Sequence, residues 1–381
     1  MNDKTLDSIA LHDLLTGAAL LGGGGGGPRA GAKPLIDYIE QLGRPVRLNA
    51  LSELPATLWA GVVAGIGAPA AATHGPAFTT APRQAFTRLA AASGRQLLAV
   101  LPGETGAMNS IIPALVAAQL GLPLVDADSA GRALPTLGLA AYNFAAPPNP
   151  LVLANEPAEG TNAVEAVLDT PTPADADALV RGLVETTAFG EEGAFSTWAL
   201  QIGQLAGACV AGSVSRAIRV GAALRRAKAI GSDPIAAVRD ALGGRLVVLA
   251  SGPITAVATR EGGGFDMSRV ILHDDTADVA VIAQNENLLA WRTDKDAPLA
   301  AAPDTLAWLT ADGEPLSNAE ITAQTVGTRV HLLGIPADPL LRREPLAGRF
   351  TQLLAQVGFF GNAPVLLWGG DRFVTTQDSV R

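Results

Sequence analysis

Five polar side chains that could act together on a small molecule occur in one segment, residues 102–136, PGETGAMNSIIPALVAAQLGLPLVDADSAGRALPT. These side chains are Glu104, Asn109, Asp126, Asp128 and Arg132. A carboxylate removes a proton from water, an amide binds ring oxygen or nitrogen atoms, and an arginine pairs with an anionic group of a substrate. The segment therefore predicts a site at which water attacks a bound small molecule.

The acidic residues of this segment leave two interpretations open. In the functional one, Asp126 or Asp128 is the general base and the other is held by Arg132, or both share a divalent cation with Glu104. In the structural one, Asp126 caps a turn while Asp128 and Arg132 form an ion pair. The spacing of the two aspartates alone does not decide between the two interpretations. We predict no organic cofactor.

The elements around the segment are those of an α/β protein. A helix is expected from about residue 110 to Gly121, and the apolar run 122–125 predicts a buried strand that ends at Asp126. Strands alternate with helices in this way from the N-terminus onward, which favours a mostly parallel sheet covered on both faces. Such sheets bind their ligands at the carboxyl ends of the strands, where the aspartates follow.

The length of 381 residues exceeds the size at which a single core usually stops growing, so we expect two domains. The first, residues 1–170, is the α/β domain. The second, residues 171–381, opens with a helical layer at about 175–230. A β-rich module of barrel or sandwich type follows at about 244–345, and the C-terminal tail is expected to return to the first domain.

A run of six glycines, Gly22–Gly27, follows the first expected helix. It lacks the lysine and hydroxyl residue of a P-loop, and it follows a helix where a dinucleotide fingerprint requires a strand. The backbone amides of Gly24, Gly25 and Gly26 could still bind a substrate. The sequence favours a tight turn at which the backbone passes close to another segment or to the substrate.

Three further side chains are candidates for substrate binding. His74 lies in a turn after the apolar strand 61–67, and loops after parallel strands often face the ligand. Asn285 and Glu286 interrupt an apolar run, where a buried carboxyl group would need a partner or a raised pKa. The single cysteine, Cys209, lies among small residues far from any histidine, so we expect it to be a packing residue.

The composition excludes several classes of protein. Hydrophobic residues make up 48% and charged residues 17% of the chain, and the formal net charge is -9. These values are typical of a globular protein, and the absence of a basic patch argues against nucleic-acid binding. No signal pattern or long apolar run predicts a membrane segment, so we expect a cytoplasmic protein. The small-residue stretch 199–224 would suit burial against a second subunit, and we expect a homo-oligomer.

The segment GETGAMNSIIPALVAAQLGLPLVDADSAGRALP resembles the signature of the S-methyl thiohydantoin desulfurase family. Three more motifs keep the order of that family: LLGGGGGGP, GGGF at 262–265, and AQNENLLAW followed by APDTLAWLTADGEPLSNAEI. The resemblance covers nearly the whole chain. It implies an N-terminal α/β domain and a C-terminal part with a small β-rich module.

The activity implied by the resemblance is hydrolysis of a small heterocyclic substrate, in which water replaces the methylated sulfur of an S-methyl thiohydantoin and releases methanethiol. Asp126 or Asp128 would be the base, Asn109 and the glycine amides would hold ring atoms, and Arg132 would pair with a substrate carboxylate. Ala130 and Thr136 stand where the family commonly has methionine and glutamate, and the stretch Glu104-Thr-Gly differs from the usual double glycine. Alternatives are therefore a hydrolase of a related cyclic imide or hydantoin and a non-catalytic small-molecule sensor.

Overall fold

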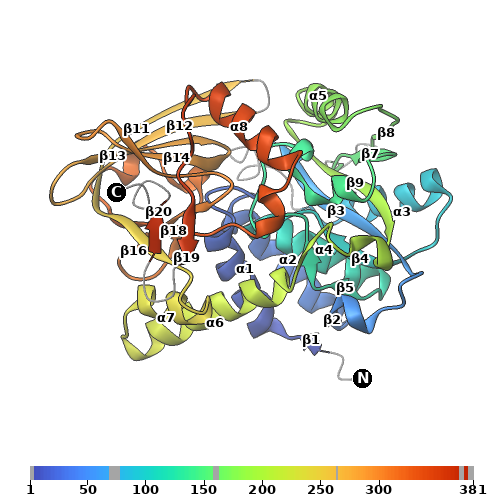
Figure 1. Cartoon of the computed structure of the whole chain (residues 1–381). Helices are drawn as coiled ribbons and strands as arrows, with labels where there is room; N and C mark the ends of the chain where they lie inside the picture. Colours follow the sequence, from blue (N-terminus) through green and yellow to red (C-terminus); the bar gives the residue numbers. More distant parts are fainter. Residues whose placement is uncertain (1–3, 68–77, 158–162, 263–264, 369–372, 376–381) are drawn as a thin grey trace.

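The fold consists of two domains, each built on its own sheet (Figure 1). The computed structural model describes residues 4–67, 78–157, 163–262, 265–368 and 373–375. The N-terminal sheet carries its helices on both faces, and the C-terminal sheet is antiparallel throughout its described strands. The predicted mixed α/β class with a β-rich C-terminal part is confirmed.

The N-terminal sheet has a parallel centre and antiparallel edges. The four strands β2, β5, β4 and β3 run parallel to one another. Each strand outside them, namely β9, β7 and β8 on one side and β1 on the other, pairs antiparallel with its neighbour. In spatial order the strands are β1 (Lys4–Leu6), β2 (Val46–Asn49), β5 (Leu124–Val125), β4 (Leu97–Pro102), β3 (Trp59–Gly67), β9 (Glu192–Gln201), β7 (Leu151–Ala154) and β8 (Glu165–Leu168). The carboxyl ends of β3 and β4 lie side by side, which brings the segments after them together.

Helices cover this sheet on two sides. One face packs against α1 (Ser8–Leu21), α2 (Arg29–Leu42), α3 (Ala81–Ser93) and α4 (Ala107–Leu120). The other face packs against α5 (Pro173–Val184) and the irregular segment 134–146. The remaining helices are α6 (Ser213–Ile230), α7 (Pro234–Ala241) and α8 (Leu346–Gln356).

One sequence prediction about this domain is wrong. Residues 195–228 were expected to continue a helical layer, but residues 192–201 form β9, which pairs with β3 in the first sheet. The reason is its packing in the folded protein. The strand β9 is buried almost throughout between β3 and β7, and this burial outweighs the weak helix preference of an alanine-containing stretch. A strand from the second half of the chain therefore borders the parallel strands.

The small residues of α1 and α6 allow these helices to touch at their backbones. A Cβ atom on Gly17 would overlap the carbonyl group of Ala217, and one on Gly221 would overlap that of Asp13. Arg225 on α6 also binds Asp13 through two nitrogens, at 2.8 and 2.9 Å. The small residues of α6 therefore pack against α1 of the same chain.

The C-terminal sheet has eight antiparallel strands and curls until β14 contacts β16. In spatial order its strands are β15 (Ala297–Ala301), β14 (Glu286–Arg292), β13 (Asp278–Gln284), β12 (Phe265–His273), β11 (Val247–Gly262), β18 (Arg329–Ile335), β16 (Thr305–Thr310) and β17 (Pro315–Leu316). Ile254, Val281 and Trp308 lie in its core. Two short ribbons complete the described strands: β6 (Ala127–Asp128) with β10 (Val210–Ala211), and β19 (Leu366–Trp368) with β20 (Phe373–Thr375).

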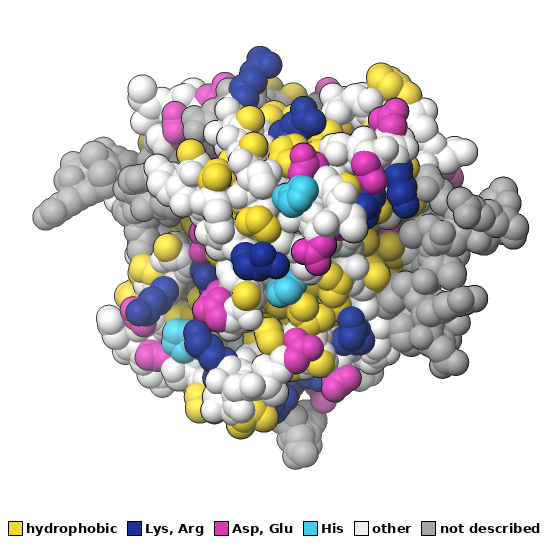
Figure 2. Space-filling view, turned by 90° about the vertical axis from the view of Figure 1, so that its left-hand side faces the viewer, with side chains coloured by type: hydrophobic (Ala, Val, Ile, Leu, Met, Phe, Trp, Pro, Cys, Tyr) yellow, Lys and Arg dark blue, Asp and Glu magenta, His cyan; other side chains and the backbone are white. Residues whose placement is uncertain are grey.

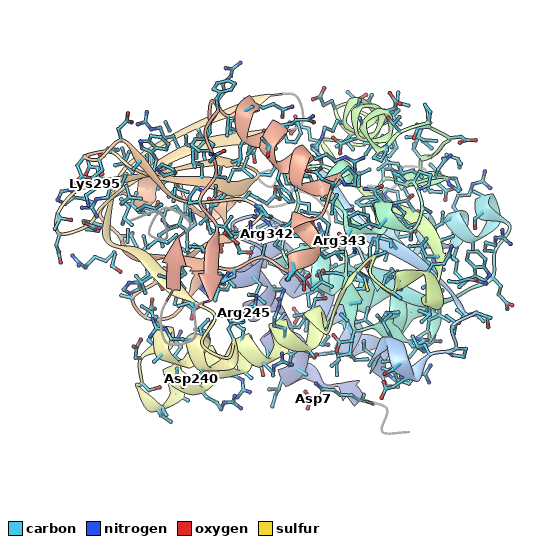
Figure 3. All side chains as sticks on the ribbon, in the orientation of Figure 1. Asp7, Asp240, Arg245, Lys295, Arg342 and Arg343 are labelled. Carbon is cyan, nitrogen blue, oxygen red and sulfur yellow. The ribbon has the colours of Figure 1, made fainter. Side chains whose placement is uncertain are left out.

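The two domains meet around buried polar and apolar contacts. Phe350 of α8 packs in one cluster with Leu139 of the N-terminal domain and Leu288 of β14. Arg342, labelled where the domains meet in Figure 3, binds the buried carboxylate of Asp304. The helix α8 therefore joins the second domain to the irregular face of the first.

On the side of the C-terminal sheet, no single type of side chain dominates the surface of the described residues. Figure 2 shows charged side chains of both signs scattered among hydrophobic ones on this face. Within the described ranges, no helix has both the length and the apolar character needed to span a bilayer.

Candidate functional site

A cavity of about 100 Å³ lies at the carboxyl ends of the parallel strands, between the two domains. Its walls come from the end of β3, the β4–α4 loop, the glycine run, the start of β9, the helix α5 and the turn before β14. Phe78, Met108, Leu134, Phe195 and Trp198 supply apolar surface. The charged and amide side chains at its walls are those of Glu104, Asn109, Asp177, Arg181, Glu192, Asn285 and Glu286.

Glu104 lies directly after β4 and is half-buried at the cavity wall. Its Oε1 accepts a hydrogen bond from Nδ2 of Asn109 at 2.7 Å, and its Oε2 accepts one from the backbone N–H of Leu134 at 2.7 Å. Burial raises the pKa of Glu104 to about 7, although both hydrogen bonds and the charge of Arg132 oppose the rise. The carboxyl group is therefore balanced between its two forms near neutral pH.

Asn109, in the first turn of α4, holds Glu104 against the sheet. Its Oδ1 accepts the N–H of Gly65 at 2.8 Å while its Nδ2 donates to Glu104. The Gly26 carbonyl accepts the Asn109 N–H at 3.1 Å, so the glycine run caps this helix start. The amide predicted to bind substrate lines the cavity, and its hydrogen-bonding groups orient a carboxylate.

Glu286 reaches the cavity from the other domain, at the first residue of β14. Only 3% of it is exposed, and within the described part of the chain its Oε2 has no hydrogen-bond partner. Burial raises the pKa of Glu286 well above its usual range, and repulsion by Glu104 raises it further, while Arg132 and Arg181 lower it. The sequence singled this residue out as a buried carboxyl group, and the structure confirms the burial.

The glycine run lies between these two carboxyl groups. A Cβ atom on Gly25 would overlap the carboxyl group of Glu286, which explains why no side chain is present there. The run also binds the second domain through the carbonyls of Gly23 and Gly24, which accept the N–H groups of Asn287 and Asn318 at 2.8 Å each. Of the three predicted substrate-binding glycines, Gly26 lines the cavity, and Gly24 and Gly25 are not among its lining residues. The geometry thus supports the interpretation of the glycine run as a tight turn at which the backbone passes close to another segment.

The structure places Arg132 differently from the expected substrate-carboxylate pair. Only 1% of it is exposed, and its guanidinium donates to the carbonyls of Pro303, Asp304 and Asn287 in the second domain at 3.0, 2.8 and 3.2 Å. A fourth bond, at 3.0 Å, goes to its neighbour Ala133. A guanidinium so enclosed by carbonyls links the domains, and it does not line the cavity.

The two aspartates, predicted as bases, also lie away from the cavity. Both oxygens of Asp126 accept bonds from Ser215, at 2.9 Å from its N–H and 2.6 Å from its hydroxyl. Asp128 is buried, and it accepts bonds from the Thr105 hydroxyl and from the N–H groups of Ala130 and Gly131. Both carboxylates thus have structural partners, but not the expected ones: Asp126 caps the first turn of α6, and Asp128 binds backbone amides in place of Arg132.

The remaining predicted positions have mixed outcomes. Asn285 lines the cavity in a left-handed backbone conformation, and its side chain accepts the N–H of Asp266 at 2.8 Å. His74 lies outside the described residues. Burial raises the pKa of the Cys209 thiol to about 12, which leaves this cysteine a poor nucleophile. In the described part of the chain, no three acidic, histidine or cysteine residues are grouped to hold a metal, so Glu104, Asp126 and Asp128 do not form a common site.

Three charged residues of the cavity escaped the sequence analysis. Glu192 begins β9 and lies within the stretch Gly-Glu-Glu-Gly at 190–193. This stretch interrupts the helical pattern, and that interruption was the signal in the sequence that could have identified Glu192. Asp177 and Arg181 are one turn apart on α5 and form an ion pair at 3.0 Å. Arg181 also donates to the carbonyl of Pro135 at 2.6 Å and lies over the ring of Phe265, 3.7 Å from its centre. Its contact with Phe265 closes the cavity between α5 and the C-terminal sheet.

The geometry therefore pairs two carboxyl groups that differ in their surroundings. Glu104 accepts two hydrogen bonds that favour its ionised form. The buried Oε2 of Glu286 has no donor among the described residues, which favours the protonated form. Such a pair can supply one base and one acid near neutral pH. Of the positions where the family pattern is broken, Glu104 and Thr136 line the cavity and Ala130 does not.

Comparisons with known proteins agree with this architecture. The profile described as "S-Me-THD-like, N-terminal domain" matches residues 9–164, and that described as "S-Me-THD-like, C-terminal domain" matches residues 172–348. The chain is also similar to a protein from Chromobacterium violaceum whose crystal structure was solved as a structural-genomics target. The two are 30% identical with a TM-score of 0.78, and the match covers 94% of this chain and 99% of the other. No curated protein matches the chain.

Proposed function

Because this chain belongs to the S-Me-THD-like family, we propose that it hydrolyses an S-methyl thiohydantoin, or a close cyclic analogue, to the hydantoin and methanethiol. The observation that carries the proposal is the meeting of Glu104 and Glu286 in one cavity. Each comes from a different domain, and burial raises the pKa of both. Buried carboxyl groups with raised pKa values in a cavity are typical of acid–base catalysis.

In the first step, Glu104 acts as the base and Glu286 as the acid. Glu104 removes a proton from water, and the water oxygen bonds to the ring carbon that carries sulfur. The electron pair of the ring carbon–nitrogen double bond moves to nitrogen, which takes the proton of Glu286. The result is a tetrahedral carbon that carries a hydroxyl group and the methylated sulfur, with Glu104 protonated and Glu286 ionised.

In the second step, the carbon–sulfur bond breaks and the two carboxyl groups return to their first state. The hydroxyl proton passes to Glu286 as the carbon–oxygen double bond forms. Methanethiolate leaves with the bonding electron pair and takes the proton from Glu104. The sum is one water consumed and one methanethiol released, with no change in oxidation state and no need for a further reactant.

The rest of the cavity suits this substrate class. Met108, Leu134 and Phe195 offer apolar surface to a methylthio group and to the faces of a small ring. Asn109 and the Leu134 N–H hold Glu104 in a fixed direction, which lowers the cost of positioning the attacking water. The volume of about 100 Å³ fits a molecule of a few ring atoms.

The test is the rate of methanethiol release from an S-methyl thiohydantoin by the wild-type protein and by Glu104→Gln and Glu286→Gln. General acid or base groups contribute about 10²- to 10⁴-fold, so each variant is expected to lose at least about 100-fold in kcat. The control is Glu320→Gln, the same change at a half-buried glutamate that pairs with Arg29 away from the cavity.

Three results would contradict the proposal in different ways. Wild-type rates in both cavity variants would place the chemistry elsewhere. Binding of the thiohydantoin by the wild-type protein without turnover would identify a sensor. Turnover of a hydantoin or cyclic imide in preference to the methylthio compound would identify a related hydrolase, and mass spectrometry of the products separates these cases.

A further inference from the structure

Besides Asp177, which pairs with Arg181, the cavity is lined by one more carboxyl group that neither step above uses. Glu192 is 8% exposed, and its buried Oε2 has no hydrogen-bond partner among the residues that the structure describes. Burial raises the pKa of Glu192 to about 7, and repulsion by Glu156 adds to the rise. A buried acceptor without a donor costs the fold free energy, so the protein maintains an unmet hydrogen-bonding group at this wall.

The neighbours of Glu192 do not explain it structurally. The nearby Glu156 accepts bonds from the N–H groups of Thr80 and Ala81 at the start of α3, so it has a capping role. The Oε2 of Glu192, by contrast, accepts no hydrogen bond from the described residues. Its free oxygen is best explained by a donor that arrives with the ligand.

The register of the sheet fixes where this acceptor lies relative to the catalytic pair. Gly65, which binds Asn109 beside Glu104, pairs with Ala194, and Gly67 pairs with Glu192. Two residues along a strand and one strand across place the Cα of Glu192 about 8 Å from that of Gly65. Glu104 and Glu192 both line the cavity, so a ring bound between them can turn one edge toward each carboxyl group.

We propose that Glu192 is a specificity-determining residue that accepts a hydrogen bond from the ring N–H of the substrate. This inference rests on the proposed function, since an S-methyl thiohydantoin retains one ring N–H while its other ring nitrogen is the imine that Glu286 protonates. Glu192 then selects rings with a free N–H and rejects N-alkylated ones. The bond is present in the ground state and in the transition state alike, so it acts on KM more than on kcat.

The test compares Glu192→Met with the wild-type protein on the parent S-methyl thiohydantoin and on its N-methyl derivatives. Methionine keeps the length of the side chain and removes the acceptor. On the parent compound the variant is expected to raise KM at least tenfold with kcat within about twofold, because hydrogen bonds to charged groups are worth about 1.5–3 kcal/mol. On the N-methyl compounds, which lack the ring N–H, the two proteins are expected to have similar KM values.

Two further variants complete the design. Glu192→Gln keeps an oxygen acceptor and is expected to restore part of the affinity for the parent compound. Glu191→Met makes the same change at the exposed neighbouring residue and is expected to change nothing. An equal loss on parent and N-methyl compounds, or an unchanged KM in Glu192→Met, would overturn the inference.

Calorimetric binding of hydantoin and N-methyl hydantoins separates this inference from the proposed function. If no methanethiol is released by the wild-type protein, the proposed reaction fails, yet the binding comparison still decides the role of Glu192. Weaker binding of hydantoin to Glu192→Met, with unchanged binding of the fully N-methylated compound, supports the subsite. Equal binding of hydantoin to both proteins overturns it.

Discussion

Replacing Asn109 by aspartate should move the pH dependence of the reaction upward. The aspartate keeps the oxygen that accepts the Gly65 N–H and removes the nitrogen that donates to Glu104. Without that donor, and with a second acid beside it, the ionised form of Glu104 becomes less stable. The reaction needs Glu104 ionised, so activity near neutral pH should fall and return at higher pH.

The size of the effect follows from the lost hydrogen bond. A hydrogen bond to a charged group is worth about 1.5–3 kcal/mol, and about 1.4 kcal/mol corresponds to one pH unit. The lower midpoint of the kcat/KM profile, expected near the pKa of about 7 for Glu104, should therefore rise by about one to two pH units. At pH 7, where about half of the wild-type Glu104 is ionised, the loss in kcat/KM is about 5- to 50-fold.

The assay is kcat/KM for hydantoin formation from pH 5 to about pH 10, with product measured by mass spectrometry. Asn155→Asp is a matched control, because Asn155 is also 8% exposed, and it too accepts a backbone N–H and donates through Nδ2, at 2.7 Å each. It does not line the cavity. A wild-type midpoint in Asn109→Asp, or the same rise in Asn155→Asp, would refute the assignment of Glu104 as the base.

Three other outcomes follow from the same contacts. Gly25→Ala should displace Glu286 and lower kcat/KM at least about 100-fold, whereas Gly43→Ala, with open space around it, should leave activity unchanged; equal activities would contradict the packing argument. Arg132→Lys should lower the free energy of unfolding in urea by about 2–4 kcal/mol, because lysine cannot reach carbonyls on both sides; an unchanged midpoint would exclude the domain-linking role. Glu192→Gln should stabilise the protein by about 1–2 kcal/mol at pH 8 and not at pH 4. The folded pKa of about 7 lies above the ordinary 4.5, so the penalty of ionising Glu192 grows from pH 4.5 to 7; equal gains at both pH values would contradict this.

The parts of the site that follow local rules were predictable from the sequence. Glu104 and Asn109 stand between a strand and a helix at the carboxyl end of a parallel sheet, where ligands usually bind. Glu286 was visible as an acidic residue inside an apolar run. These inferences need only the alternation of elements and the cost of burying a carboxyl group.

The roles of the other carboxylates depend on partners far away in the chain. Asp126 accepts a hydrogen bond from Ser215, which lies 89 residues later, and no local sequence pattern reveals that contact. The course of the turn after Asp128 decides whether this carboxylate faces the cavity. Two N–H groups of that turn and the hydroxyl of Thr105, 23 residues earlier, bind it instead. Glu192 was hidden because a strand was taken for a helix, and only its place beside β3 makes it part of the site.

The central claim is that water attacks the ring carbon with Glu104 as base. The direct measurement is turnover of an S-methyl thiohydantoin in ¹⁸O-labelled water, with hydantoin and methanethiol quantified together. The account predicts one ¹⁸O atom per hydantoin and equal amounts of the two products for the wild-type protein, with at least about 100-fold less of both for Glu104→Gln. Hydantoin without the label, or undiminished labelled product from Glu104→Gln, would contradict it.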